Sequence, residues 1–164
     1  MGSASKQKWL YDVIKDFDNA MLVTTATSGR DHVRPMHIAE IREDGDIFFA
    51  TSMDSPKITE ISVNPEVVVT FQGNRQFAAV YGRAELVRDR NLINHLWSEA
   101  WKVWFPDGKS DPTLCLIRVD GREGEYWDNA GVQGIKYAFE AAKAYMRGRS
   151  PKQDEKQTGK VHIL

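Results

Sequence analysis

The chain has 164 residues, of which 41% are hydrophobic, and 22 Lys and Arg stand against 23 Asp and Glu, for a formal net charge of -1. Its length suits one domain with a buried core, and a chain this apolar is not disordered as a whole. The charge balance argues against a general nucleic-acid binder, which usually has a basic excess. The single cysteine, Cys115, excludes an internal disulfide and a cysteine-based zinc site.

No apolar run approaches the roughly 18 residues that cross a bilayer, and the first residues lack the apolar core of a secretion signal. We therefore expect a cytoplasmic protein with no membrane or nucleic-acid partner.

The first half of the chain opens with a helical pattern and continues with strands. Apolar residues recur at helical spacing over residues 5–18, and β-branched runs separated by turns follow them. The expected elements are a helix at 5–18, strands at 21–27, 32–41 and 47–51, a short helix at 55–63 and a strand at 66–71. The last strand is apolar throughout, which indicates burial on both faces.

The second half continues the strand pattern and adds two longer helices. Gly82 predicts a bulge or a close backbone approach, and Asp89 is placed to cap a helix that reaches Trp101. The expected elements are a strand at 76–87, helices at 89–101 and 132–147, and a polar, mobile tail at 149–164. Residues 113–119 and 124–128 are expected to form a last long strand or a hairpin. Consecutive strands without alternating helices favour an antiparallel barrel or sandwich with peripheral helices.

Residues Ile47 to Lys57 predict a strand that runs directly into a helix start. Ser55 has the character of an N-cap, and Pro56 stands at the first helical position. The N–H groups at a helix start attract anions, phosphate above all. Thr51, Ser52 and Ser55 would add hydroxyl donors, and Lys57 would add a full positive charge. The alternative is an ordinary junction whose serine only caps the helix.

Arg34 lies on the strand that precedes this junction. Strands joined by a tight turn usually pair, so Arg34 is expected near the helix start, where it would bind phosphate oxygens in a bidentate manner. Pro35 has no N–H to donate, which indicates an unpaired local edge that faces a ligand or a partner chain. The alternative for Arg34 is an exposed strand charge.

Most catalytic signatures are absent from the sequence. The four histidines, His32, His37, His95 and His162, have no spacing that places two metal ligands on one helix face. No nucleophile elbow, Walker loop or dinucleotide-binding glycine motif occurs. Cys115 lies in an apolar strand, where a thiol is usually inert.

The ordered combination of motifs resembles the flavin-binding split barrel of the pyridoxamine phosphate oxidase superfamily. The motifs are Val23-Thr24-Thr25, Val33-Arg34-Pro35-Met36, Phe48-Phe49-Ala50-Thr51, Ser55-x-Lys57 and Asn64-Pro65-x-Val67. The later segments Trp101–Pro106, Leu114–Val119 and Gly124–Asp128 are similar to the bacterial general stress protein branch. The resemblance covers roughly residues 5–148 and implies one antiparallel six-stranded split β-barrel domain at 1–148, mainly β with peripheral helices.

The resemblance implies a homodimer that binds FMN in a groove between the two barrels. Pro56 stands where the family often has a basic residue, so one phosphate contact is expected to be missing. The implied contacts are Arg34, Pro35, Met36 and His37 to the flavin ring and ribityl chain, Phe49, Ala50 and Thr51 to the ring or ribityl chain, Ser55 and Lys57 to the phosphate, Gln76 to the pyrimidine edge, and Trp127 from the partner chain.

The implied function is an FMN-binding protein of the general stress type, with flavin-dependent oxidoreductase activity on an unspecified substrate. Authentic pyridoxamine phosphate oxidases carry an Arg-x-His substrate element, and nothing after Tyr126 reproduces it. Two alternatives stay open: a non-enzymatic dimer that stores flavin or binds a partner through Trp97, Trp101 and Trp104, and a reductase that uses a deazaflavin or haem, with His37 as the axial candidate. The sequence does not separate FMN from FAD.

Overall fold

The computed structural model describes residues 2–152 and 154–164. The strands are β1 (Asn19–Thr25), β2 (Asp31–Ile41), β3 (Asp46–Ser52), β4 (Glu66–Gln72), β5 (Gln76–Val87), β6 (Leu114–Asp128) and β7 (Thr158–His162). The helices are α1 (Ser3–Ile14), α2 (Pro56–Val63), α3 (Arg90–Leu96) and α4 (Gly131–Arg147), with the 3₁₀ turns η1 (Glu99–Val103) and η2 (Gly108–Ser110).

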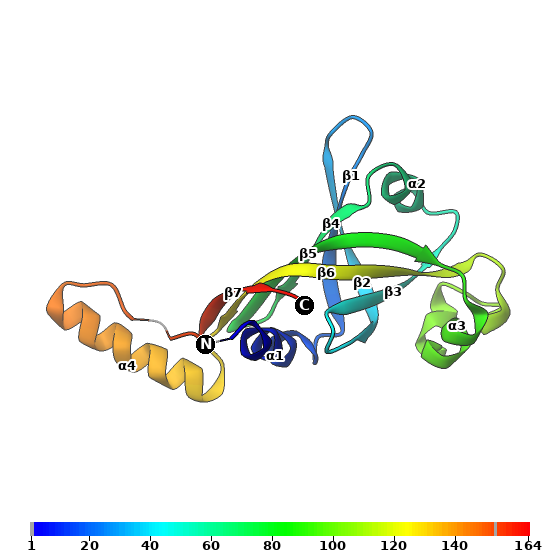
Figure 1. Cartoon of the computed structure of the whole chain (residues 1–164). Coiled ribbons are helices and arrows are strands. Elements are labelled where there is room, and N and C mark those ends of the chain that lie inside the picture. The colour runs from blue at the N-terminus through cyan, green and yellow to red at the C-terminus, as the bar shows by residue number, and fades with distance from the viewer. Residues whose placement is uncertain (1, 153) are drawn as a thin grey trace.

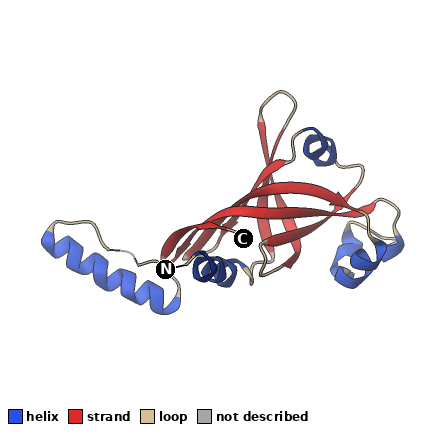
Figure 2. Cartoon of the chain, in the orientation of Figure 1, coloured by secondary structure: helices blue, strands red, loops and turns tan. Residues whose placement is uncertain are grey.

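Six strands close into a barrel in the order β3-β2-β1-β4-β5-β6, because β3 also pairs with β6 (Figure 1). Every pairing is antiparallel, and β7 adds to the free side of β6. The helices lie outside the strands, as Figure 2 shows. The predicted antiparallel six-stranded split barrel with peripheral helices is confirmed.

Two apolar cores hold the molecule together. The first fills the barrel and is closed at one end by Leu10, Val13 and Ile14 of α1. The second lies between the outside of β3 and the segment that contains α3 and η1. Successive strand residues point to opposite faces, so Phe48 packs in the second core while Phe49 packs in the first.

The prediction of one helix at 89–101 is wrong, because two short helices, α3 and η1, lie there instead. Asp89 accepts a hydrogen bond from the Asn91 N–H at 2.9 Å, but Trp97 is extended with φ −51° and ψ 134°. Ser98 then accepts from the Ala100 N–H at 3.4 Å and caps η1. A second capping residue inside the apolar pattern restarts the chain in a new direction.

The segment predicted as a polar, mobile tail contains a paired strand. β7 runs antiparallel to β6, and the Ile163 N–H donates to the Arg122 carbonyl at 2.8 Å. Gln157, Val161 and Ile163 are buried. The tail is polar on average, but alternating apolar residues at its end match a strand with one buried face. The prediction of a mobile tail is wrong for β7, because it was based on the average composition of the segment and not on the alternation of apolar residues at its end.

Smaller differences concern element ends and burial. The first helix ends at Ile14 rather than at residue 18. Of the two alternatives for the last β segment, one long strand or a hairpin, the structure has the long strand, β6. Strand β4 buries Val67, Val69 and Phe71, whereas Val68 is only half-buried. The prediction of burial on both faces is therefore wrong for β4. In the described part of the chain, no helix is long and apolar enough to cross a membrane.

Candidate functional site

The structure has a pocket of about 300 Å³ where β2, β3 and the start of α2 meet η1. Strand β3 pairs with β2 only from Ile38 onward, so the edge of β2 before that residue is open on this side. Pro35, Met36 and His37 come from this open edge and form one wall. The prediction that Pro35 marks an unpaired edge is confirmed, since β2 pairs there with β1 alone.

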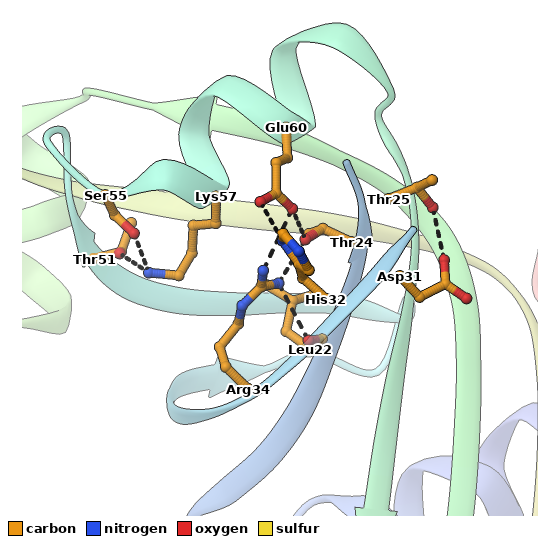
Figure 3. A network of polar contacts seen from close by, with 10 residues as sticks. All are labelled: Leu22, Thr24, Thr25, Asp31, His32, Arg34, Thr51, Ser55, Lys57 and Glu60. Carbon is orange, nitrogen blue, oxygen red and sulfur yellow. Dashed lines mark hydrogen bonds and ion pairs between the residues drawn. The ribbon is translucent and has the colours of Figure 1, made fainter. Parts of the chain in front are cut away.

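The polar end of the pocket is formed by the junction between β3 and α2. The Lys57 ammonium donates to the Thr51 hydroxyl at 3.0 Å and to the Ser55 hydroxyl at 2.5 Å (Figure 3). Ser55 is the N-cap residue by position, but its hydroxyl makes no capping bond and accepts from Lys57 instead. Pro56 occupies the first helical position, as predicted, and removes one N–H from the helix start.

Lys57 is a half-buried cation. Burial, followed by the nearby Arg34 guanidinium, lowers the pKa of the Lys57 ammonium below its ordinary value. An anion placed beside this ammonium would offset both effects, since it replaces lost solvation and screens the second cation. The geometry thus provides a positive site with two hydroxyls at one end of the pocket.

A further part of the pocket lining is aromatic and comes from η1 and the residues after it. Trp101, Trp104 and Phe105 line the pocket there. The Trp104 ring lies 6.4 Å from the His37 ring, at an interplanar angle of 32°. Trp101 is buried, and its indole N–H has no hydrogen-bond partner among the described residues. A buried donor without a partner is costly, so this N–H would gain from an acceptor on a bound ligand.

Arg34 is engaged with a buried carboxylate. Its guanidinium donates to the Thr24 hydroxyl at 2.6 Å, to the Leu22 carbonyl at 3.3 Å and to Glu60 at 3.4 Å. Glu60 also receives the Thr24 hydroxyl at 2.5 Å and contacts His32 Nδ1 at 2.7 Å (Figure 3). The Thr24 hydrogen bond, then those from His32 and the charge of Arg34, lower the pKa of Glu60 against the effect of burial.

The structure brings together seven of the eleven predicted site residues. They are Pro35, Met36, His37, Ala50, Thr51, Ser55 and Lys57, all on the pocket lining. Arg34 lies close by and faces Glu60 rather than the pocket. Phe49 points into the barrel and is fully buried in the first core.

Gln76 and Trp127 lie at the far end of the molecule. The pocket end of the β5–β6 ribbon carries the pair Val87 and Leu116, whereas Gln76 pairs with Asp128 at the other end. Eleven residue steps of an extended strand span roughly 35 Å. These two predicted contacts therefore cannot reach the pocket of their own chain.

The site predicted from the sequence lacks Trp101, Trp104 and Phe105, although all three line the pocket. Ser52, which the sequence offers as a hydroxyl donor at the junction, lines the pocket as well. Trp104 was considered only as part of a surface stripe with Trp97 and Trp101. The missed signal is a cluster of large aromatics beside Pro106, in a segment whose helical pattern is interrupted at Ser98. Aromatic residues in an irregular segment commonly line ligand pockets.

Comparisons with known proteins agree with this architecture. A family model described as pyridoxamine 5'-phosphate oxidase like matches residues 5–152. A general stress protein 26 from Jannaschia sp. CCS1 superimposes with a TM-score of 0.77 at 23% identity, covering 97% of this chain and 99% of that chain. That likeness concerns the fold.

Two further relatives are more similar in sequence. The general stress FMN/FAD binding protein from Xanthomonas citri has a TM-score of 0.63 and 27% identity, over 77% of this chain and 89% of that chain. Protein bli-3 of Neurospora crassa is 28% identical over 111 residues, which are 60% of this chain and 53% of bli-3. The chain thus spans about half the length of that curated relative.

Proposed function

We propose that this chain, which belongs to the pyridoxamine 5'-phosphate oxidase-like family, is an FMN-binding protein of the general stress type with flavin-dependent oxidoreductase activity. The observation that carries the proposal is the combination of an anion site and aromatic side chains in one pocket. The Lys57 ammonium with two hydroxyls and the aromatic residues of the η1 segment line the same pocket. FMN has the matching groups, a phosphate and a planar ring.

The residues present fit this cofactor. Lys57, Ser55 and Thr51 would hold the phosphate through charge and hydroxyl hydrogen bonds. Met36 and His37 would line the ribityl chain and the ring. The Trp101 N–H, which has no partner among the described residues, would donate to an acceptor on the ribityl chain or the ring. Bound FMN would supply hydride or electron transfer, while the protein supplies position and electrostatics.

One comparison favours a flavin over other cofactors. The relative from Xanthomonas citri, at 27% identity, is described as FMN/FAD binding. We do not expect pyridoxamine phosphate oxidation, because the Arg-x-His element is missing after Tyr126. We place the activity in the cytoplasm, since one buried cysteine fits a reducing compartment.

We further propose that the protein acts as a homodimer through the outer face of β1, β4 and β5. Val33, Val23, Val68 and Tyr81 are register neighbours across four adjacent strands on this face. Val33 and Tyr81 are exposed, and the other two are half-buried. A contiguous apolar row on the outside of a barrel is typical of an interaction surface.

A two-fold contact on this face would complete the pocket. The row continues toward Trp127, which pairs with Phe77, while Pro35 on the pocket wall pairs with Met21 of β1. An isologous contact pairs residue i of one chain with residue j of its partner and the reverse, so a two-fold axis at the middle of the row would place the far end of one ribbon over the near end of its partner. Gln76 and Trp127 would then reach the partner's pocket, which accounts for their distance from their own.

The test is an absorbance spectrum of the purified protein, an FMN titration and anaerobic reduction with NADH and NADPH. We expect flavin absorbance, saturable binding of one FMN per chain, and bleaching by a nicotinamide donor. A protein that takes up no FMN would overturn the proposal.

The same experiment separates the alternatives. A Soret band after haem addition would instead support a haem site beside His37. Tighter binding of a deazaflavin than of FMN would support a deazaflavin as the cofactor. Bound FMN that resists both nicotinamide donors and dithionite would indicate a flavin-storing role without oxidoreductase activity.

A further inference from the structure

Helix α4 carries an exposed apolar stripe that the proposed flavin site does not explain. The helix extends away from the barrel (Figure 1). Ile135, Phe139, Ala142 and Met146 recur at intervals of four, three and four residues, so they lie along one face. Ile135 is 72% exposed, Phe139 60% and Met146 85%. Large apolar side chains aligned in this way mark a contact surface.

The stripe is not the side that attaches α4 to its own chain. Ala144, on another face of the helix, is buried. The Arg149 N–H donates to the Ala144 carbonyl at 2.8 Å, where the chain turns back along the helix. The Gln157 side-chain amide donates to the Gln133 carbonyl at 2.9 Å. The stripe therefore stays free to contact another molecule.

The base of α4 is fixed to the end of the β5–β6 ribbon. Only Asn129 and Ala130 separate β6 from the helix. The Asn129 N–H donates to the Arg75 carbonyl at 2.9 Å, and the Ala130 N–H donates to the Asp128 carboxylate at 3.1 Å. The position of α4 thus follows that of Trp127, three residues before Ala130.

The rim of the pocket has an exposed apolar surface that could contact the stripe. Trp104, which lines the pocket, is 62% exposed, and its neighbour Val103 is 79% exposed. These residues follow α3, at the end of the molecule opposite to α4 (Figure 1). The two apolar surfaces of one chain therefore cannot meet each other.

We propose that α4 of each subunit covers the mouth of the partner's pocket, with the stripe of Ile135, Phe139 and Met146 packed on the partner's Val103 and the partner's Trp104. This inference rests on the homodimer of the proposed function, in which Trp127 reaches the partner's pocket. The helix starts next to Trp127 and, with 17 residues, is about 25 Å long, enough to cross the pocket mouth. Such a cover excludes water from the site.

The test is a cross-link between α4 and the pocket rim. The double variant Phe139→Cys with Trp104→Cys is treated with a short bismaleimide in the absence of flavin. Because α4 and the segment that follows α3 lie at opposite ends of the molecule (Figure 1), the product can form only between chains. Cys115 stays silent, since burial raises the pKa of its thiol to about 11.

We expect most of the double variant to run as a covalent dimer on a denaturing gel. The matched control replaces Phe139→Cys by Tyr145→Cys, a residue of the same helix that is exposed but lies outside the stripe. We expect at least tenfold less dimer from it. No covalent dimer from the first pair, or equal dimer from both pairs, would overturn the inference.

A second measurement links the cover to the pocket. Phe139→Glu should raise the FMN dissociation constant about tenfold without changing the dimer mass, whereas Tyr145→Glu should leave it unchanged. Equal effects of the two variants would overturn the cover. Failure of wild-type protein to bind FMN, with the specific cross-link present, would overturn the cofactor and leave the α4 contact in place.

Discussion

Lys57 concentrates the anion-binding chemistry of the pocket in one side chain. A hydrogen bond to a charged group contributes about 1.5–3 kcal/mol, so Lys57→Met should weaken FMN binding roughly 10- to 100-fold. Lys57→Arg, which keeps the charge, should retain most of the affinity. Flavin fluorescence titration measures both constants. An unchanged constant in Lys57→Met would place the phosphate elsewhere.

Glu60 makes the stability of the protein depend on pH. Its folded pKa lies below the ordinary 4.5, chiefly because the Thr24 hydroxyl donates to it. A carboxylate with a lowered folded pKa stabilises the fold fully above its unfolded pKa, and this stabilisation is lost as the pH falls through the folded pKa.

Glu60→Gln should therefore unfold more easily at pH 7, by about 1–3 kcal/mol, since buried donors lose a charged acceptor. The difference from wild type should shrink as the pH falls through the lowered folded pKa of Glu60, where wild-type Glu60 becomes protonated. Urea unfolding at pH 7 and at low pH measures this difference in the free energy of unfolding between wild type and Glu60→Gln. The exposed Glu66, paired with Arg83, supplies the control: Glu66→Gln should change stability by less than about 1 kcal/mol. A constant difference at all pH values would contradict this account.

At the scale of single elements, Gly82 is required where β5 approaches β6. The pairing register shifts between Tyr81 and Gly82, which confirms the predicted bulge or close approach. A Cβ at Gly82 would lie 2.2 Å from the Asp120 carbonyl oxygen. Because the obstacle is backbone, the strands would have to separate.

Gly82→Ala should consequently destabilise the protein by about 2–4 kcal/mol, although alanine normally favours a strand over glycine. Ala79→Gly, on the same strand outside the bulge, should cost only about 0.5–1 kcal/mol. Thermal and urea unfolding compare the two. A Gly82→Ala variant as stable as wild type would show that the strands have room at this point.

The elements that differ from prediction share a cause. The pattern of α3 and η1 reads as one helix, yet Ser98 caps a new start inside it. The polar segment before β7 conceals Val161 and Ile163, which are buried only because β6 offers a free edge. In both places, the local sequence pattern predicts one structure, and the contacts made with the rest of the chain favour another.

At the scale of the whole molecule, the proposed dimer interface is the outer face of β1, β4 and β5. Tyr81→Lys places a charge in the middle of the proposed interface and should convert a dimer into a monomer. The monomer should keep its unfolding temperature within a few degrees and lose at least tenfold in FMN affinity, since the partner's residues are missing. Light scattering after size exclusion gives the mass.

Val63→Lys is the matched control for this change. Val63 is exposed like Tyr81 but lies on α2, away from the row. It should remain dimeric with unchanged FMN affinity. A Tyr81→Lys protein that stays dimeric would show that the interface lies on another face. A monomeric wild-type protein would contradict the proposed dimer.

Local chemistry was enough to predict the succession of strands along the chain and the strand–helix junction with Ser55 at the N-cap and Pro56 at the first helical position. Alternation, turn residues and capping act over a few neighbouring residues, so they can be read along the chain. The contact of Arg34 with Glu60 and the pocket wall at Trp104 join residues that meet only when the barrel closes. The same holds for β7, and for the distance of Gln76 from its own pocket. Which strand edge stays open, and which side chain a charge faces, is set by long-range packing.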